Sequence, residues 1–128
     1  MSNRTKIRTI TVVVVLAITC FAPVFLVAAD EWFDSFGRLS KNDELARFTR
    51  LAVFLREHPE TIGFIAFCTG PHDRNSTQMH QKTRGINFIV SRFKIPRSRI
   101  KVIDYGRCRE TTTILEPVDR AKPIPQFF

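Results

Sequence analysis

TIGFIAFCTGPHDRNSTQMHQKTRGINFIVSRF, residues 61–93, is the stretch that decides the fold. Its first eight residues are apolar, β-branched or aromatic, and a run of this length predicts a buried strand over 61–68. Thr69 is followed by Gly70 and a proline, which mark a turn and end the strand. The stretch therefore starts with a strand that breaks sharply.

A helix is predicted after the turn. Apolar or small side chains recur there at spacings of four and three residues, as on one helical face: Met79, Thr83, Ile86, Val90 and Phe93. The opposite flank is polar: His80, Arg84, Asn87 and Ser91. We expect Asn75, Ser76 or Thr77 to cap the helix. It should end before Pro96, because the residue before a proline avoids the helical region.

Another helix is predicted upstream, over ELARFTRLAVFLREH, residues 44–58. Its apolar residues again follow helical spacing: Leu45, Phe48, Leu51, Ala52 and Leu55. Ser40 or Asn42 can cap it, and we expect Asp43 and Glu44 to act as carboxylates that favour a helix N-terminus. Residues 30–40 are expected to form a short strand or an extended arm.

Two strands are predicted downstream, over residues 100–105 and 110–118. The first alternates apolar and polar side chains, as a half-buried strand does. The second carries Pro117 near its end, which favours an edge position in the sheet. The order β-α-β-α-β-β predicts an α/β two-layer sandwich, with two helices on one face of a small mixed sheet.

Residues 1–29 have the pattern of a secretory signal peptide. Three basic residues precede an uncharged, strongly apolar run, and Val27-Ala28-Ala29 supplies the small residues of a cleavage site. An uncleaved membrane anchor is the alternative, because 21 uncharged residues are long enough to span a bilayer. Cys20 lies within this segment, and we expect it to be removed with it.

Removing residues 1–29 leaves 99 residues, which is one small domain. The removal takes away three of the 20 basic residues and none of the 12 acidic ones, so the net charge falls from +8 to +5. This moderate positive charge fits an acidic partner or a solvated surface. Nucleic acid is not an expected partner, because an exported chain rarely meets it and no basic run is interleaved with aromatic residues.

Two cysteines then remain, Cys68 and Cys108. An even pair in an exported chain predicts a disulfide. The loop it would close is about 40 residues long, which contributes about 4 kcal/mol in the chain-entropy account. Two separate buried thiols are the alternative.

The cluster Cys68, His72 and Asp73 also allows catalytic or metal-binding interpretations. A Cys68 nucleophile would need a base oriented by a third group, and a disulfide would remove its thiolate. Zinc would need three or four converging ligands, whereas His72 and His80 are separated by a turn and part of a helix. We therefore favour a structural cysteine, a loop histidine and a solvated or capping His80, with no metal and no cofactor.

The element order, the element lengths and three local motifs resemble the OmpA-like family of periplasmic peptidoglycan-binding domains. The motifs are a strand ending in Thr69, Arg84-Gly85 at the place of the family's Arg-Ala dipeptide, and FKIPRSRIKV at residues 93–102. The last is similar to the family's G-I-x-x-x-R-I link into the third strand. The resemblance covers residues 32–118, and it implies that the predicted disulfide joins the ends of the second and third strands.

In that family an Asp directly after the second strand and an Arg on the second helix hold a diaminopimelate zwitterion. The carboxylate meets the ammonium group, and the guanidinium meets the carboxylate as a bidentate pair. Arg84 matches the family's Arg, whereas Gly70 stands where the family has Asp. Asp73, three residues further on, is the candidate replacement. Arg107 and Arg109 flank Cys108, and with Arg74, Lys82 and Arg84 they are candidates for a basic rim, with a solvated face as the alternative.

The resemblance implies an exported, non-catalytic OmpA-like domain over 30–119, followed by a disordered segment over 120–128. It would lie in the periplasm of a Gram-negative bacterium or be secreted. Its expected partner is peptidoglycan or another anionic or zwitterionic envelope component, contacted through four residues: Thr69, Gly70, Asp73 and Arg84. Membrane contact is expected only through the N-terminal segment. The rival interpretation is a protein-interaction or scaffold domain that has lost peptidoglycan binding, and a thiol enzyme using Cys68 ranks last.

Overall fold

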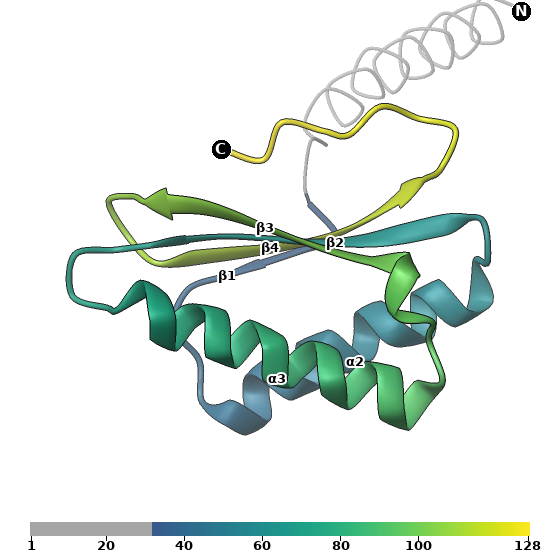
Figure 1. Ribbon diagram of the computed structural model, residues 1–128, viewed down its shortest axis with the longest axis horizontal. Coiled ribbons are helices and arrows are strands. Elements are labelled where there is room, and N and C mark those ends of the chain that lie inside the picture. The colour runs from purple at the N-terminus through teal and green to yellow at the C-terminus, as the bar shows by residue number, and fades with distance from the viewer. Residues whose placement is uncertain (1–31) are drawn as a thin grey trace, which may run out of the picture. The chain divides into compact units, whose positions relative to one another are not determined.

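Two helices cover one face of a four-stranded sheet in the computed structural model, which describes residues 32–128 (Figure 1). The predicted signal peptide, residues 1–29, lies outside the described residues. The strands are β1 (Asp34–Phe36), β2 (Thr61–Thr69), β3 (Ile100–Arg107) and β4 (Thr112–Asp119). The helices are α2 (Lys41–Glu57) and α3 (Asn75–Phe93), and a 3-10 turn, Arg97–Arg99, precedes β3.

The strand order in the sheet is β1-β4-β2-β3. β2 runs parallel to β3 and antiparallel to β4, and β1 runs antiparallel to β4. The mixed sheet with both helices packed on it confirms the predicted two-layer α/β architecture and its β-α-β-α-β-β order. Between residues 32 and 128, no helix is both long and apolar enough to cross a membrane.

The predicted edge position of the last strand is wrong, because β4 lies between β1 and β2. Pro117 pairs in register with Gly63 of β2. On its other side β1 reaches only from Thr113 to Leu115 in the register of β4, so Pro117 lies beyond the end of β1. A proline is tolerated where a neighbouring strand is missing, because no hydrogen bond to that strand is lost there.

Helix α2 begins as the sequence predicts. The Ser40 hydroxyl accepts a hydrogen bond from the Asp43 backbone nitrogen and caps the helix. The predicted apolar face is buried, with Phe48 and its neighbours Leu51, Ala52 and Leu55 fully shielded from solvent. Asp43 and Glu44 lie in the first turn as predicted, and Glu44 is buried there.

Helix α3 is turned relative to the predicted apolar face. Met79 is 38% exposed and Thr83 is exposed. The buried face is instead made of Gln78, Lys82, Gly85, Ile86 and Ile89. A Cβ atom at Gly85 would lie 3.0 Å from ring atoms of Phe48, so the missing side chain lets the two helices approach closely. This orientation sends Lys82 into the interior, where Glu44 pairs with it.

A second apolar cluster lies on the sheet face away from the helices. Its buried members are Phe64, Ala66, Ile114 and Phe127, and partly buried residues such as Trp32 and Tyr105 pack against them. Phe127 belongs to the C-terminal segment, residues 120–128, which contains no helix or strand. The sequence predicts disorder for this segment, yet Phe127 is only 5% exposed.

Candidate functional site

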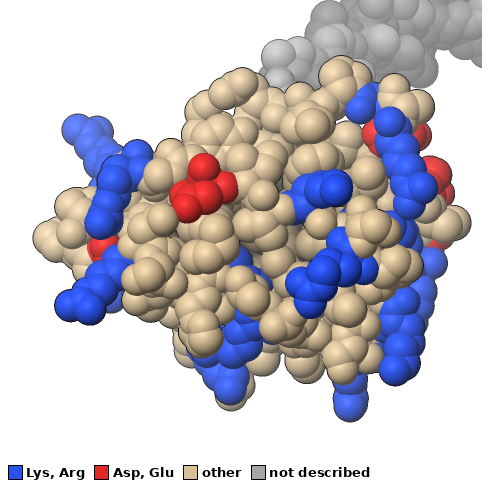
Figure 2. Space-filling view, in the orientation of Figure 1, with Lys and Arg blue, Asp and Glu red and all other residues tan. Residues whose placement is uncertain are grey.

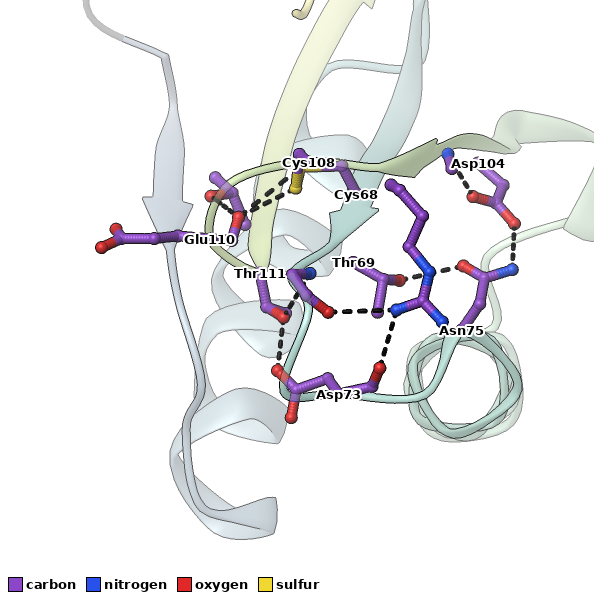
Figure 3. The surroundings of a disulfide bond; sticks show 12 residues. Cys68, Thr69, Asp73, Asn75, Asp104, Cys108, Glu110 and Thr111 are labelled. Carbon is purple, nitrogen blue, oxygen red and sulfur yellow. Dashed lines mark hydrogen bonds between the residues drawn. A yellow bond between two sulfur atoms is a disulfide. The ribbon is translucent and has the colours of Figure 1, made fainter.

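The disulfide joins the end of β2 to the residue after β3 (Figure 3). The Cα atoms of Cys68 and Cys108 lie 5.7 Å apart, and the Cys108 backbone nitrogen donates to the Thr69 carbonyl at 3.0 Å. The predicted bridge is confirmed, and it removes the thiolate that a Cys68 nucleophile would require. It also fixes the loop between β3 and β4 against the strand end that carries Gly70.

Gly70 has no room for a side chain. A Cβ atom there would lie 2.8 Å from the Thr111 backbone nitrogen and 3.2 Å from the Glu110 Cα. The Gly70 backbone nitrogen donates to the Thr111 hydroxyl at 2.9 Å, which holds the two segments together. A backbone, not a movable side chain, occupies the space in which an Asp at position 70 would begin.

Asp73 is turned toward the same loop and is already paired. The Thr111 hydroxyl donates a short hydrogen bond to one Asp73 carboxylate oxygen, and the Arg38 Nε lies 3.2 Å from the other. The Asp73 backbone nitrogen closes the turn by donating to the Gly70 carbonyl at 3.2 Å. Only 11% of the Asp73 side chain is exposed, and its carboxylate ties the turn to Thr111 and Arg38.

Thr69 and Asn75 form a chain of hydrogen bonds across the start of α3 (Figure 3). The Thr69 hydroxyl donates to the Asn75 Oδ1, and the Asn75 amide donates to the Asp104 carboxylate, both at 2.9 Å. The other Asp104 oxygen accepts from the Gly106 backbone nitrogen at 2.8 Å. The predicted cap is therefore wrong: α3 has Arg74 at its N-cap without a side-chain bond, because Asn75 ties β2 to β3.

Two members of the predicted basic rim, Arg107 and Lys82, are engaged within the protein. Arg107 donates from one nitrogen, Nη1, to the carbonyls of Gly70 at 3.1 Å and Asp73 at 2.8 Å, so it braces the loop. Lys82 is 2% exposed and donates to the Glu44 carboxylate at 2.9 Å. Lysine and arginine side chains are spread over the visible face and not gathered in one patch (Figure 2).

Burial lowers the pKa of Lys82 from its ordinary value of 10.5. The hydrogen bond and the charge of Glu44 oppose this effect, and the positive charge of Arg84 adds to it as the smallest cause. The positive charges of Lys82 and Arg84 therefore repel each other within α3. Lys82 is paired with the Glu44 carboxylate, whereas Arg84 has no such pair within the described residues.

Arg84 is half-buried, and its Nε is shielded from solvent. Within residues 32–128, this Nε has no hydrogen-bond partner, and no salt bridge joins Arg84 to a carboxylate. Asp73 pairs with Arg38 instead. The two residues that the sequence suggested as a replacement clamp are thus not joined by an ion pair.

A hollow of about 260 Å³ opens beside the Asp73 loop. Its lining residues are Gly37, Arg38, Gly70, Pro71, His72, Asp73, Arg109, Glu110 and Thr111. Sequence reasoning found Gly70 and Asp73 but missed Arg38 and Thr111, because neither lies in a motif and both come from distant segments. Within the described residues, no group of three or more His, Cys, Asp and Glu side chains is arranged to hold a metal ion.

Comparison with known proteins does not assign the chain. No protein-family model matches it, and no curated protein sequence matches it.

Proposed function

We propose that this chain is an exported, non-catalytic interaction domain of the OmpA-like type that has lost the ammonium–carboxylate clamp of peptidoglycan binding. The observation that carries the proposal is the closure at Gly70. An Asp there would place its Cβ 2.8 Å from a backbone nitrogen, so the family's ligand-holding carboxylate is excluded. A zwitterion would then meet no carboxylate at the family's position to balance its ammonium group.

The remaining polar groups of the loop support the same proposal. Asp73 is shared between Thr111 and Arg38, and Arg107 is bound to two carbonyls of the loop. Groups that a binding site would present to a ligand instead satisfy one another. A polar cluster of this kind stabilises a loop and leaves little for ligand recognition. The disulfide is compatible with an oxidising compartment, which fits an exported chain.

A second candidate function is recognition of an anionic envelope component by Arg84. It is favoured by the shielded Arg84 Nε, which has no partner in the part of the chain that the structure describes. An arginine that keeps its guanidinium free can bind a carboxylate or phosphate as a bidentate pair. Loss of the neighbouring carboxylate would shift the preference from a zwitterion to an anion.

Co-sedimentation with purified peptidoglycan sacculi separates the two candidates. The first predicts that the wild-type chain stays in the supernatant under conditions in which an OmpA-like domain with an intact Asp–Arg clamp pellets. The second predicts that the wild-type chain pellets and that Arg84→Ala abolishes this. Arg92→Ala is the matched control, because Arg92 is an exposed arginine on the same helix. Pelleting that survives Arg84→Ala contradicts both candidates.

A further inference from the structure

The C-terminal segment crosses the sheet face that the helices leave open (Figure 1). After β4 it turns back and runs along the side of the sheet away from the helices as an extended chain (Figure 1). The face beneath it is apolar, with Ile62, Phe64, Ile103 and Val118 among its members. A sheet whose two faces are both apolar requires a cover on each side.

One ring fastens the segment to this face. Phe127 stacks on Trp32 with ring centroids 5.0 Å apart, and Phe64 and Tyr105 complete the pocket at 5.9 and 6.5 Å. Phe127 is 5% exposed, whereas Phe128 is 45% exposed and Ile124 is 65% exposed. The Phe128 ring also contacts Tyr105, with centroids 5.0 Å apart, but Phe127 is the one buried aromatic side chain of the segment.

The rest of the segment is loosely held. No backbone hydrogen bond joins residues 123–128 to the sheet within the described part of the chain. The last such bond is donated by the Lys122 backbone nitrogen to the carbonyl of Asp119, the last residue of β4, at 3.0 Å, and the Arg120 nitrogen donates to the Glu60 carbonyl just before β2 at 3.1 Å. Two hollows of about 440 and 450 Å³ adjoin Ile124, so the segment does not fill the groove that it crosses. One buried ring must offset the ordering of all these residues.

We propose that this sheet face is a binding site for an extended segment with an aromatic anchor, and that the C-terminal segment of a second copy enters it. Each copy carries both the pocket and the segment that fits it. If two copies exchange their C-terminal segments, every contact of Phe127 is kept, so the exchange is a low-cost route to a dimer. Pro123 and Pro125 favour an extended connection, which lets the segment reach outward as well as fold back.

The charge around the groove favours a peptide over a membrane surface. Outside residues 121–128, Lys101 and Arg120 line one of the two hollows, Glu116 lines the other, and Asp119 lines both. An anionic lipid surface would select an unmixed basic rim. A mixed rim around an apolar floor instead suits a segment such as residues 121–128, which carries one lysine and otherwise uncharged side chains.

This inference names a surface for the interaction role proposed above, but it does not depend on the lost clamp. The sacculus experiment tests the loop beside Gly70, whereas the experiment below tests the opposite sheet face. Either can fail while the other holds.

The single tryptophan of the chain reports on the pocket directly. An acceptor chain, Phe127→Ala, keeps Trp32 and empties the pocket, so its emission should shift to longer wavelength than that of the wild type. A donor chain, Trp32→Phe, has an intact C-terminal segment and no tryptophan signal. Excess donor should return the acceptor emission toward the wild-type value, and native mass spectrometry should detect the mixed dimer.

The controls isolate Phe127. Phe128→Ala removes an exposed ring from the same segment and should leave the emission unchanged. A donor with both Trp32→Phe and Phe127→Ala should not restore the acceptor. If circular dichroism shows that Phe127→Ala is unfolded, Phe127→Leu replaces it, because leucine retains apolar contact but cannot stack on Trp32.

Three results would overturn the proposal. Restoration by a synthetic peptide of residues 121–128 but not by the donor chain would show a pocket that does not accept a second copy. Equal emission from wild type and acceptor would show that Phe127 does not occupy the pocket. Flotation of the acceptor with phosphatidylglycerol vesicles, without restoration by the donor, would assign the face to a lipid surface.

Discussion

The Cβ position of Gly70 lies 2.8 Å from the backbone nitrogen of Thr111, so the end of β2 and the loop before β4 touch through their backbones. The disulfide between Cys68 and Cys108 and the hydrogen bond from Gly70 to the Thr111 hydroxyl keep them there. Because the obstacle is backbone, a side chain at position 70 cannot be accommodated by a rotamer change. The path of the neighbouring loop therefore excludes an Asp side chain at position 70.

Gly70→Ala should destabilise the protein by about 1–3 kcal/mol, the usual cost of forcing extra atoms into a closely packed position. The free energy of unfolding from urea denaturation measures the loss. Gly37→Ala is the matched control, because its Cβ would lie 3.5 Å from the Thr111 carbonyl oxygen, which is ordinary contact. Equal stability of Gly70→Ala and Gly37→Ala would contradict the closure.

The disulfide should supply a large share of the stability. It closes a loop with a sequence separation of 40, and the double variant Cys68→Ala, Cys108→Ala should lose about 4 kcal/mol in the chain-entropy account. The measurement is urea denaturation with and without reductant. Reductant should lower the wild-type midpoint and leave that of the double variant unchanged. A reductant effect on the double variant would point to another cause.

The outline of the fold was predictable because its signals are local. Each helix has apolar residues at helical spacing, glycine or proline lies near the ends of the predicted strands, and the two cysteines outside the predicted signal peptide predict the bridge. The orientation of α3 was not predictable in this way. Gln78 and Lys82 look solvated in the sequence, and only Glu44, 38 residues before Lys82, makes the burial of the lysine acceptable.

The site was predicted in part, for a related reason. Gly70 and Asp73 lie inside the strand–turn–helix stretch, where the missing family carboxylate draws attention to them. Their partners Arg38 and Thr111 come from segments without a motif, and they meet Asp73 only after the sheet has formed. Phe127 lies in a proline-rich segment without periodicity, so the sequence offers no sign of the aromatic pocket that holds it.

The buried pair of Lys82 and Glu44 should make stability depend on pH in the alkaline range. Burial lowers the pKa of Lys82 in the folded state below 10.5, so the unfolded chain binds the extra proton between the two values. The charged lysine thus costs stability at neutral pH, and the cost is relieved as pH rises from the lowered pKa to 10.5. As pH rises through this range, the free energy of unfolding of the wild type should therefore increase relative to that of Lys82→Met.

Lys101→Met is the control for this pH dependence, because the exposed Lys101 ammonium is solvated in both the folded and unfolded states. Glu44→Gln adds a test of the pair itself. It leaves the buried lysine without a charged partner and should cost about 3–5 kcal/mol at neutral pH. A flat difference between wild type and Lys82→Met from pH 7 to 10.5 would show that Lys82 is solvated.

Glu116 should oppose stability at neutral pH. Its carboxylate accepts a hydrogen bond from the Phe33 backbone nitrogen at 2.7 Å, but burial raises its pKa above 4.5 despite this bond. The protonated Glu116 favours the folded state below pH 4.5, and this stabilisation is lost as pH rises through the raised pKa. Glu116→Gln, which still accepts from Phe33, should stabilise the protein at pH 7 by less than about 1 kcal/mol, because the group is partly solvated.

The pH dependence of this gain distinguishes the cost of a charged, half-buried carboxylate from a simple change of packing. The gain from Glu116→Gln should shrink to zero below pH 4.5, where the wild-type carboxyl is protonated in both states. Glu110→Gln is the exposed control. A gain of equal size at pH 4 and pH 7, measured by urea denaturation, would assign the effect to packing.

Replacing Arg99 even by lysine should destabilise the protein. Its guanidinium is buried, and its Nη2 donates to three carbonyls at the end of α2 and the start of β2: Leu55 at 2.7 Å, His58 at 2.8 Å and Thr61 at 2.9 Å. Its Nε also donates to the Thr61 carbonyl, at 3.1 Å. These carbonyls lie where the helix leaves its last acceptors without partners, and the rigid guanidinium directs two nitrogens at them. Lysine has one nitrogen on a flexible stem and loses the Nε bond, so Arg99→Lys should lose about 1.5–3 kcal/mol. Arg97→Lys, two residues earlier, changes an exposed arginine that donates to Asn87 and should cost little. Urea midpoints at an unchanged slope measure both, and equal losses would mean that the fork at Arg99 contributes nothing special.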